Sequence, residues 1–471
     1  MKSNPLTWTP ELSEESGPIY LAVADALARD LQNGLLRPGD QLPTQRDLAR
    51  HLGVNAMTIS RAYAEAGRRG LTEGEVGRGT FVKRQERNTT RLEPQGLSAD
   101  PMIDFHFNLP WGDPSLLDAS EILRELAEGD PATWLHTGYH AAGTARHRES
   151  GAAWLARSGV EADAERILVC GGAQHAMTIT LASLTTPGDL VLTEELTYPG
   201  MKALASVLGV RLLGLPMDSQ GLLPEALDHA CRQRNPKALY CMPTIQNPTG
   251  RVQGEARRRE MAEVARRHGL TIVEDDTYTF LLEDPPTPIA SIAPERTWFL
   301  TGTSKSLTAG LRIGYLLAPQ VENLDALLAR VEGHVAALTW MAAPLMAEVA
   351  SRWIRSGAAE TMVAWKRREA RERRRLFERY LPEIPTESSP ASPHVWLPLP
   401  RPWRSEDFVA LAGRRGIALT GAEAFVAGRA SAPHAVRVSL GTPPQREQVE
   451  NGLRGLAEIL SGSVEIPRAL V

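Results

Sequence analysis

Short apolar runs alternate with longer segments of mixed polarity through the middle of the chain. The runs are Ile167–Val169, Leu190–Leu192, Ala238–Cys241, Leu270–Val273, Trp298–Leu300 and Ile313–Leu317. Because helical segments separate these runs, the alternation predicts a mainly parallel sheet with helices on both faces. Ligands of such sheets bind at the carboxyl ends of the strands. This part of the chain is therefore expected to adopt an α/β fold.

The N-terminal part shows a different pattern, in which short amphipathic helices precede a hairpin. Apolar positions at helical spacing run from Ile19 to Gly34. Thr44 can cap a second helix with Asp47 three residues later, and Asn55 can cap a third. Two helices joined by a glycine-containing turn and followed by a basic hairpin predict a winged helix-turn-helix. The alternative is a plain helical bundle with solvated arginines.

Charge is distributed unevenly along the chain. The formal net charge is −4, yet residues 46–84 carry eight basic and four acidic side chains. This local excess suits a polyanionic partner such as DNA. The run Lys366–Arg379 carries eight basic and three acidic residues. For this second run a long solvent-exposed helix face is the favoured interpretation, and DNA contact is the alternative.

A chain of 471 residues is too long for one core and suggests about two to four domains. Residues 1–83 form the predicted DNA-binding domain, residues 84–102 a polar tether, and residues 103–471 a large domain. No apolar segment has the length of a membrane span or the form of a secretory signal, so the protein is expected in the cytoplasm. The three cysteines show no metal-ligand spacing, which predicts buried or unreactive thiols and no metal site.

The motifs of the N-terminal part resemble the winged-helix domain of the GntR family. They are Pro-Gly-Asp-x-Leu-Pro-x-x-Arg-x-Leu-Ala, then Thr-x-x-x-Ala-Tyr, then Gly-x-Gly-Thr-Phe-Val. The resemblance implies that a double-stranded DNA operator is contacted by Arg46, Asn55, Thr58, Arg61 and the wing residues Gly77, Arg78 and Gly79. Ala56 stands where the family often has an arginine, which removes one bidentate guanine contact. The resemblance therefore does not predict the operator sequence.

Lys305 is the most informative residue of the large domain. It follows an apolar strand, and Arg312 comes seven residues later in the segment 304–315. A buried amine is easily deprotonated and can condense with an aldehyde, while an arginine fork can hold a phosphate. These two groups together indicate pyridoxal 5′-phosphate (PLP) as the cofactor.

Further polar residues fall at the ends of the predicted strands. Residues 171–175 follow the first strand and open a helix, whose amides can receive phosphate. The Asn247 amide can bond a phenolic oxygen, and Asp275 can keep a pyridine nitrogen protonated. Arg437 lies inside an apolar run near the C-terminus, where a buried guanidinium needs an anion such as an amino-acid carboxylate.

Residues 103–460 resemble the fold-type I aminotransferases, which have a mainly parallel sheet and a small C-terminal α+β subdomain. The resemblance implies that Lys305 forms the internal aldimine and that Arg437 binds the ligand carboxylate. The remaining cofactor contacts that it implies are Asp275 on the ring nitrogen, Asn247 and Tyr278 on O3′, Tyr198 stacked on the ring, and Ala173, Gln174, Ser304 and Arg312 on the phosphate. Tyr139 matches a tyrosine that reaches the phosphate of the neighbouring subunit. Gly302 replaces a hydroxyl residue of the family, so that phosphate contact is lost or moved to Thr301 or Thr303.

A GntR-type reader joined to an aminotransferase-like domain resembles the MocR family of bacterial transcription regulators. The resemblance implies a PLP-binding homodimer whose large domain senses PLP or a small amino compound through the Lys305 aldimine. The leading hypothesis is therefore a DNA-binding regulator. A working aminotransferase that carries a DNA-binding module is the main alternative, because the groups needed for transamination are present. A vestigial lysine site is the third.

Overall fold

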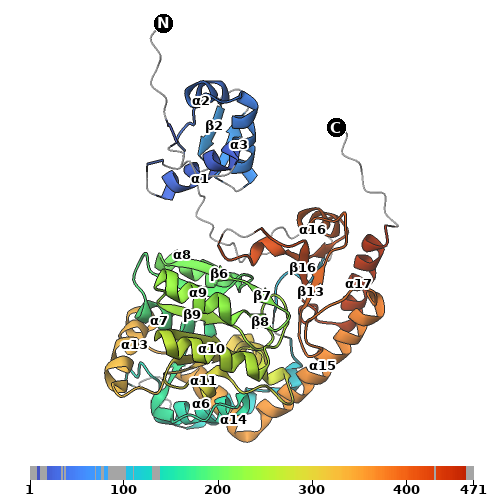
Figure 1. Ribbon diagram of the computed structural model, residues 1–471. Helices are drawn as coiled ribbons and strands as arrows, with labels where there is room; N and C mark the ends of the chain where they lie inside the picture. The colour runs from blue at the N-terminus through green and yellow to red at the C-terminus, as the bar shows by residue number, and fades with distance from the viewer. Residues whose placement is uncertain are drawn as a thin grey trace. The chain divides into compact units, whose positions relative to one another are not determined.

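The computed structural model describes the chain as two compact units, Met1–Glu93 and Pro94–Val471 (Figure 1). The residues that it describes are 8–10, 18–32, 35–36, 39–68, 71–75, 79–82, 102–109, 111–129, 138–428 and 431–462. The predicted tether 84–102 lies outside these residues, except for Met102.

The N-terminal unit is a three-helix module followed by a hairpin. Its elements are α1 (Ile19–Gln32), α2 (Gln45–Leu52), α3 (Ala56–Arg68), β1 (Thr72–Glu75) and β2 (Gly79–Val82). The two strands pair antiparallel, and the helices enclose a core that includes Val23, Leu27, Leu48 and Ile59. The helix-turn-helix and both strands of the wing therefore form as predicted.

Local caps set the boundaries of the two helices of the helix-turn-helix. Thr44 accepts a hydrogen bond from the Asp47 amide, and Gly53 ends α2 at a φ of 65°. Asn55 Oδ1 accepts from the Met57 amide at 2.9 Å and opens α3. The capping box is only half formed, because the Asp47 carboxylate accepts from the Thr44 hydroxyl at 2.6 Å.

The large unit is built on a seven-stranded sheet in the order β4-β12-β11-β10-β9-β5-β6. All pairs are parallel except those of β12, which runs antiparallel to β11 and β4. The strands are β4 (Ile167–Cys170), β5 (Leu190–Glu194), β6 (Arg211–Leu215), β9 (Ala238–Cys241), β10 (Thr271–Asp275), β11 (Thr297–Gly302) and β12 (Gly314–Leu317). Six of them coincide with the predicted runs. Edge strand β6 was missed because its side chains are mostly only half-buried.

Helices cover both faces of this sheet (Figure 1). One face packs against α7 (Ala173–Leu184), α8 (Pro199–Leu208) and α13 (Leu324–Thr339). The other packs against α9, α10 and α11 toward β6 and against α6 and α14 toward β4. These helices are α6 (Ala145–Leu155), α9 (Pro224–Arg234), α10 (Glu255–His268), α11 (Ile289–Ile292) and α14 (Pro344–Ser356).

A small α+β subdomain follows the sheet in sequence. Its three-stranded sheet has the order β13 (Val395–Pro398), β16 (Ala435–Val438) and β15 (Thr420–Gly421), covered by α16 (Ser405–Arg414) and α17 (Arg446–Leu460). The strand β3 (Ile103–Asp104) returns to pair with β14 (Ile417–Ala418). Residues that follow β3 are thereby placed between the large sheet and the subdomain.

The helix α15 (Ala358–Tyr380) holds the basic run for which a solvent-exposed face was the favoured interpretation. That interpretation is wrong for part of the run, because Lys366 is 0% exposed and Arg373 is 2% exposed. Arg373 donates to the carbonyls of Leu440 and Pro443. The helix contacts both α14 and α17 (Figure 1), so several of its charged residues face protein on more than one side.

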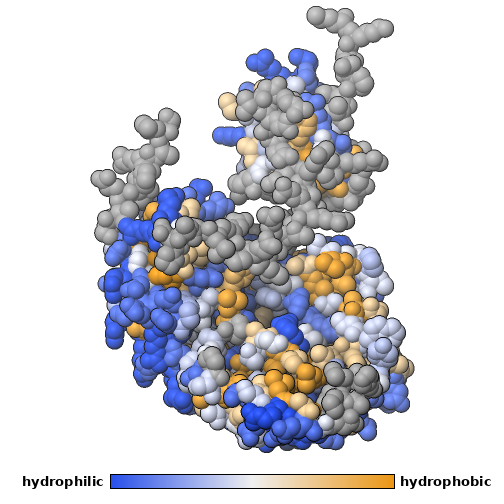
Figure 2. Space-filling view, turned by 180° about the vertical axis from the view of Figure 1, so that it is seen from behind, coloured by the Kyte–Doolittle hydropathy of each residue, from blue (hydrophilic) through white to orange (hydrophobic). Residues whose placement is uncertain are grey.

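The state of the cysteines, the length of the apolar helices and the apolar surface complete the description of the fold. The cysteines are free, and Cys170 and Cys241 are buried. No helix in the described part of the chain is long and apolar enough to cross a bilayer. Apolar residues are exposed in patches on the face of the large unit drawn in Figure 2.

Candidate functional site

A cradle for an anion forms where β4 leads into α7. Gly172 precedes the helix at a φ of 92°, and the first amides of α7 have no partner within the helix. A Cβ on Gly172 would lie 2.9 Å from the Arg312 guanidinium, so only glycine allows this approach. Arg312 donates to the Ser304 hydroxyl at 3.0 Å. The structure therefore brings the start of α7 together with Ser304 and Arg312, whereas the Gln174 side chain is exposed.

Gly302 also faces this cradle, since a Cβ there would lie 3.2 Å from the Ala173 nitrogen. Thr303 donates its hydroxyl to the Ile313 carbonyl at 2.9 Å. Thr301 alternates with Leu300, whose side chain packs on the α7 face of the sheet, and so points to the opposite face. Neither threonine proton is thus directed at the cradle.

Asp275 ends β10 at the same edge of the sheet and is 4% exposed. Its Oδ2 accepts from the Tyr240 hydroxyl at 2.8 Å, whereas its Oδ1 is buried with no hydrogen-bond partner. Burial raises the pKa of this carboxyl to about 7, against the lowering effect of Tyr240. A buried acceptor without a donor is costly, and a protonated pyridine nitrogen is a donor that fits it.

Lys305 lies on the short helix α12 (Thr303–Ser306) that follows β11. Its Nζ donates to the Asn108 carbonyl. Desolvation lowers the pKa of the amine to about 8, and the positive charges of Arg437 and Arg312 add to this shift. A larger fraction of this amine is therefore uncharged and nucleophilic near neutral pH than of an ordinary lysine.

A buried network surrounds the Tyr278 hydroxyl. Asn108 Nδ2 donates to this hydroxyl at 2.7 Å and to His394 Nδ1 at 2.9 Å. His394 Nε2 faces the Gln246 carbonyl at 3.0 Å, so Nε2 carries the proton and Nδ1 accepts. Burial lowers the pKa of His394 to about 3, which keeps the ring neutral. Because Tyr278 accepts from Asn108, its own proton is free for another acceptor.

Asn108 and His394 were not predicted from the sequence. Asn108 lies 170 residues from Tyr278 and 286 residues from His394. Neither residue stands in a motif with a recognisable spacing. One feature of the sequence could have pointed to Asn108, which is a polar residue that closely follows β3.

Arg437 on β16 is 5% exposed, and its guanidinium contacts a predicted cofactor residue. It donates to Asn247 Oδ1 at 2.8 Å and to the His106 carbonyl at 2.6 Å. The first bond orients the Asn247 amide so that its NH₂ group remains available as a donor. Arg437 Nε is buried without a partner, and no carboxylate in the described part of the chain forms an ion pair with the guanidinium. Burial lowers its pKa to about 10.

The two remaining tyrosines lie in different settings. Tyr198 precedes α8, and the charges of Asp275, Arg437 and Arg312 all act on its hydroxyl. Tyr139 is 74% exposed and packs on the ring of Trp340 at a centroid distance of 5.0 Å. Within one chain, Tyr198 therefore lies near the other predicted cofactor residues, whereas Tyr139 lies on the surface.

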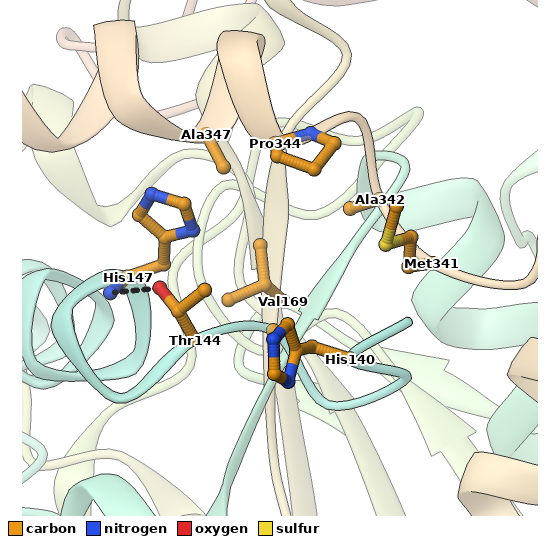
Figure 3. A pocket seen from close by; sticks show the side chains of 9 residues that line it. His140, Thr144, His147, Val169, Met341, Ala342, Pro344 and Ala347 are labelled. Carbon is orange, nitrogen blue, oxygen red and sulfur yellow. Dashed lines mark hydrogen bonds between the residues drawn. The ribbon is translucent and has the colours of Figure 1, made fainter. Parts of the chain in front are cut away.

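A small pocket lies between α6 and α14 (Figure 3). Its lining residues are His140, Gly143, Thr144, His147, Val169, Met341, Ala342, Pro344 and Ala347. None of them belongs to the predicted cofactor set. His147 instead pairs with the buried Glu348 at 3.4 Å, which also accepts from Arg352. This cluster joins two helices and is separate from the Lys305 site.

The predicted DNA contacts lie along α2, α3 and the wing. Arg46, Asn55 and Arg61 are exposed, and Thr58 is half-buried. Gly79 adopts a φ of 121° and would meet the Gln41 side chain if it carried a Cβ. Gly77 and Arg78 lie outside the described residues. Met57, at 66% exposure, is the large apolar side chain of the first turn of α3.

Family comparisons match both units. Residues 19–82 match the bacterial regulatory proteins of the gntR family, and residues 106–456 match aminotransferase class I and II. HTH-type transcriptional regulator YdeF of Bacillus subtilis (strain 168), itself described as uncharacterized, is 32% identical over 461 residues, covering 97% of each chain. This chain belongs to the MocR family. It is a GntR-type transcription regulator fused to an aminotransferase-like domain.

Other relatives extend the comparison. This MocR-type chain is 27% identical over 386 residues to the HTH-type pyridoxine biosynthesis transcriptional regulator PdxR of Corynebacterium glutamicum, covering 79% of this chain and 80% of that one. The fold of the large unit is similar to that of Pyrococcus horikoshii kynurenine aminotransferase, with a TM-score of 0.69, 24% identity and coverage of 78% and 92%. The large unit is therefore a fold-type I domain, and its cofactor is PLP.

Proposed function

We propose that the protein is a PLP-dependent transcription regulator that binds a DNA operator and senses a small amino compound or PLP through Lys305. The proposal rests on the buried Lys305 amine, which donates to the Asn108 carbonyl and whose pKa is lowered to about 8, together with two buried groups that lack partners. These groups are Asp275 Oδ1 and Arg437 Nε. One requires a donor and the other an acceptor, which are the groups that a pyridinium ring and a carboxylate present.

The residues of the site fit the cofactor by position and by chemistry. Ala173, Gln174, Ser304 and Arg312 would hold its phosphate, Asp275 its ring nitrogen, and Asn247 and Tyr278 its phenolic oxygen. Tyr198 would cover the ring, and Tyr139 is assigned to the phosphate in the neighbouring subunit of a homodimer. When bound, PLP supplies an aldehyde that reacts with amines and a ring that withdraws electrons.

The residues of this chain would control protonation, orient the side chains around the cofactor and bind the carboxylate of the ligand. Desolvation keeps part of the Lys305 amine uncharged, Asp275 holds a proton at the ring nitrogen, and Asn108 keeps the Tyr278 hydroxyl oriented. Arg437 binds the carboxylate of the amino compound. When it is not bonded to the cofactor, the Lys305 amine would be free to carry a proton.

We assign residues 1–83 to operator binding, 84–102 to a tether and 103–471 to ligand sensing, and we place the regulator in the cytoplasm. Binding of the amino compound must favour one arrangement of the domains over another to change DNA binding. Coupling free energies between two sites are typically about 1–3 kcal/mol. Operator affinity should therefore change by about 5- to 150-fold between the free and the ligand-bound protein.

Two measurements test this proposal. Borohydride reduction of the PLP-loaded protein followed by peptide mass mapping should place the adduct on Lys305 and lose it in Lys305→Ala. Operator binding, measured at one fixed salt concentration with and without PLP and each member of an amino-acid panel, should change with at least one of these compounds. A protein that carries no adduct, or whose operator affinity neither PLP nor any amine alters, contradicts the proposal.

An aminotransferase with a DNA-binding module is the second candidate, because Asp275 and Lys305 have the placement that transamination requires. The two candidates differ in turnover. Multiple-turnover loss of the visible absorption band with formation of a keto acid would support the enzyme. A stable spectral change without keto acid would support the regulator.

A further inference from the structure

Lys366 on α15 is a buried lysine that the proposed function does not use. Its side chain is 0% exposed. Its Nζ donates to the Lys305 carbonyl at 2.8 Å and to the Leu307 carbonyl at 3.0 Å. The lysine thus contacts the backbone of the residue that is assigned to the cofactor.

These two carbonyls need an external donor. The helix α12 has 4 residues, and the amide of Leu307, which follows it, donates to the Thr303 carbonyl. The last carbonyls of any helix lack an amide partner, and a lysine can supply the donor. Lys366 therefore closes the turn that carries Lys305.

The surroundings of Lys366 do not resemble those of a salt bridge. No carboxylate among the described residues pairs with it, and its Nζ lies 5.7 Å from the centroid of the Trp111 ring. Burial and the like charge of Lys305 lower its pKa to about 7. An uncharged amine retains two N–H groups, so both carbonyls keep a donor in either protonation state.

The helix that carries Lys366 is itself fixed to the fold. One residue further on, Arg367 donates to the Phe280 carbonyl at 2.6 Å, and Arg373 is bonded to the small subdomain at its other end. The Lys366 side chain therefore extends from a fixed support to the turn of Lys305.

We propose that Lys366 is a positioning residue for Lys305, because its Nζ bonds to the Lys305 and Leu307 carbonyls and so fixes the end of the turn from which the Lys305 side chain projects. The proposal rests on the assignment of Lys305 to the cofactor. It assigns to α15 an indirect effect on cofactor binding that no motif of the chain indicates. Lys366 acts through the Lys305 backbone and makes no contact that would require the cofactor to touch it.

The test compares Lys366→Met with Lys366→Arg in the full-length protein. Methionine keeps the length and removes the donors, whereas arginine keeps donors and charge. The PLP dissociation constant should rise by about tenfold or more in Lys366→Met, as expected when two hydrogen bonds are lost. It should stay closer to that of the wild type in Lys366→Arg. Far-UV circular dichroism and melting of each apoprotein establish that it is folded.

The pH midpoint of the visible absorption band separates positioning from plain structural support. Lys305 faces Arg312 and Arg437, and it is the charged neighbour of Lys366. The midpoint should move in Lys366→Met, because the turn that holds Lys305 is no longer fixed, and it should stay close to that of the wild type in Lys366→Arg. Arg368→Met, which removes an exposed cation of the same helix, is the matched control and should change neither quantity.

The outcomes are distinct. A folded Lys366→Met protein with the wild-type dissociation constant and midpoint overturns the proposal. A change in melting alone, with both quantities unaltered, also overturns it. If the wild-type protein forms no adduct at Lys305 under borohydride, the proposed function fails and Lys366 has no role to support.

Discussion

Asn108 Nδ2 donates to the Tyr278 hydroxyl across 2.7 Å, although 170 residues separate the two in the chain. The same amide also donates to His394 Nδ1. Asn108 therefore holds two buried groups from different parts of the large unit, and its loss would leave the Tyr278 hydroxyl and His394 Nδ1 without this donor.

Asn108→Ala should lower the free energy of unfolding of the apoprotein by about 1–3 kcal/mol, the usual cost of leaving buried polar groups unpaired. Urea denaturation followed by circular dichroism measures it. Asn323→Ala is the control, since Asn323 is exposed and its side chain caps no amide. It should change stability by less than about 0.5 kcal/mol. Equal effects of the two variants would show that the network contributes nothing.

Asp275→Asn should stabilise the apoprotein at alkaline pH. The folded pKa of Asp275 is raised to about 7, so its contribution to stability is present below the unfolded value near 4 and is lost as pH rises through 7. Asparagine removes this loss. The gain should be close to zero at pH ~4 and about 1–3 kcal/mol at pH ~8. Denaturation at both pH values measures it, and a gain that does not depend on pH would contradict the assigned cause.

The same variant, Asp275→Asn, should bind PLP more weakly than the wild-type protein. Asparagine cannot carry the negative charge that a protonated ring nitrogen requires, so cofactor affinity should fall while apoprotein stability rises. A PLP titration by absorbance checks this. Unchanged affinity would remove Asp275 from the ring nitrogen.

Arg437→Met should weaken the binding of amino acids and spare amines that lack a carboxylate. Charge-assisted hydrogen bonds contribute about 1.5–3 kcal/mol each, so the loss should be about 10- to 150-fold. Spectral titration with an amino acid and with its decarboxylated amine forms the matched comparison. Equal weakening of both ligands would show that Arg437 serves the fold and not the carboxylate.

Arg46→Ala and Arg61→Ala should weaken operator binding in ways that distinguish their contacts. A base contact should change sequence preference by about 1–3 kcal/mol, and a phosphate contact should weaken all sequences alike and reduce the salt slope by about one. Gel-shift or fluorescence titrations at several salt concentrations measure both. Arg368→Met, in the large unit, is the control. Wild-type binding by both variants would refute the proposed contact surface.

Much of the architecture could be predicted because it depends on local patterns. The apolar runs of β4, β9 and β11 are short and uninterrupted, and both helices of the helix-turn-helix start at residues whose side chains bond to nearby amides. Such signals act within a few residues of the chain. The edge strand β6 lacked a clear pattern because its central side chains are only half-buried and Gly214 interrupts its apolar run.

Local patterns did not predict which charged residues of α15 are buried. A basic run favours a solvated helix face by composition. Whether a given cation is exposed depends instead on which elements pack around the helix, and Lys366 meets two carbonyls brought there by α12.

The sequence by itself determined the order of most elements and the fold class, because caps, apolar periods and motif residues act over short distances, and it predicted the type of chemistry near Lys305. Tertiary structure decided the partners: Asn108 for Tyr278, Arg437 for Asn247, and Lys366 for the Lys305 backbone. These contacts join residues at least 61 positions apart. Their energies depend on burial and orientation, which arise only when the sheet, α15 and the small subdomain pack together.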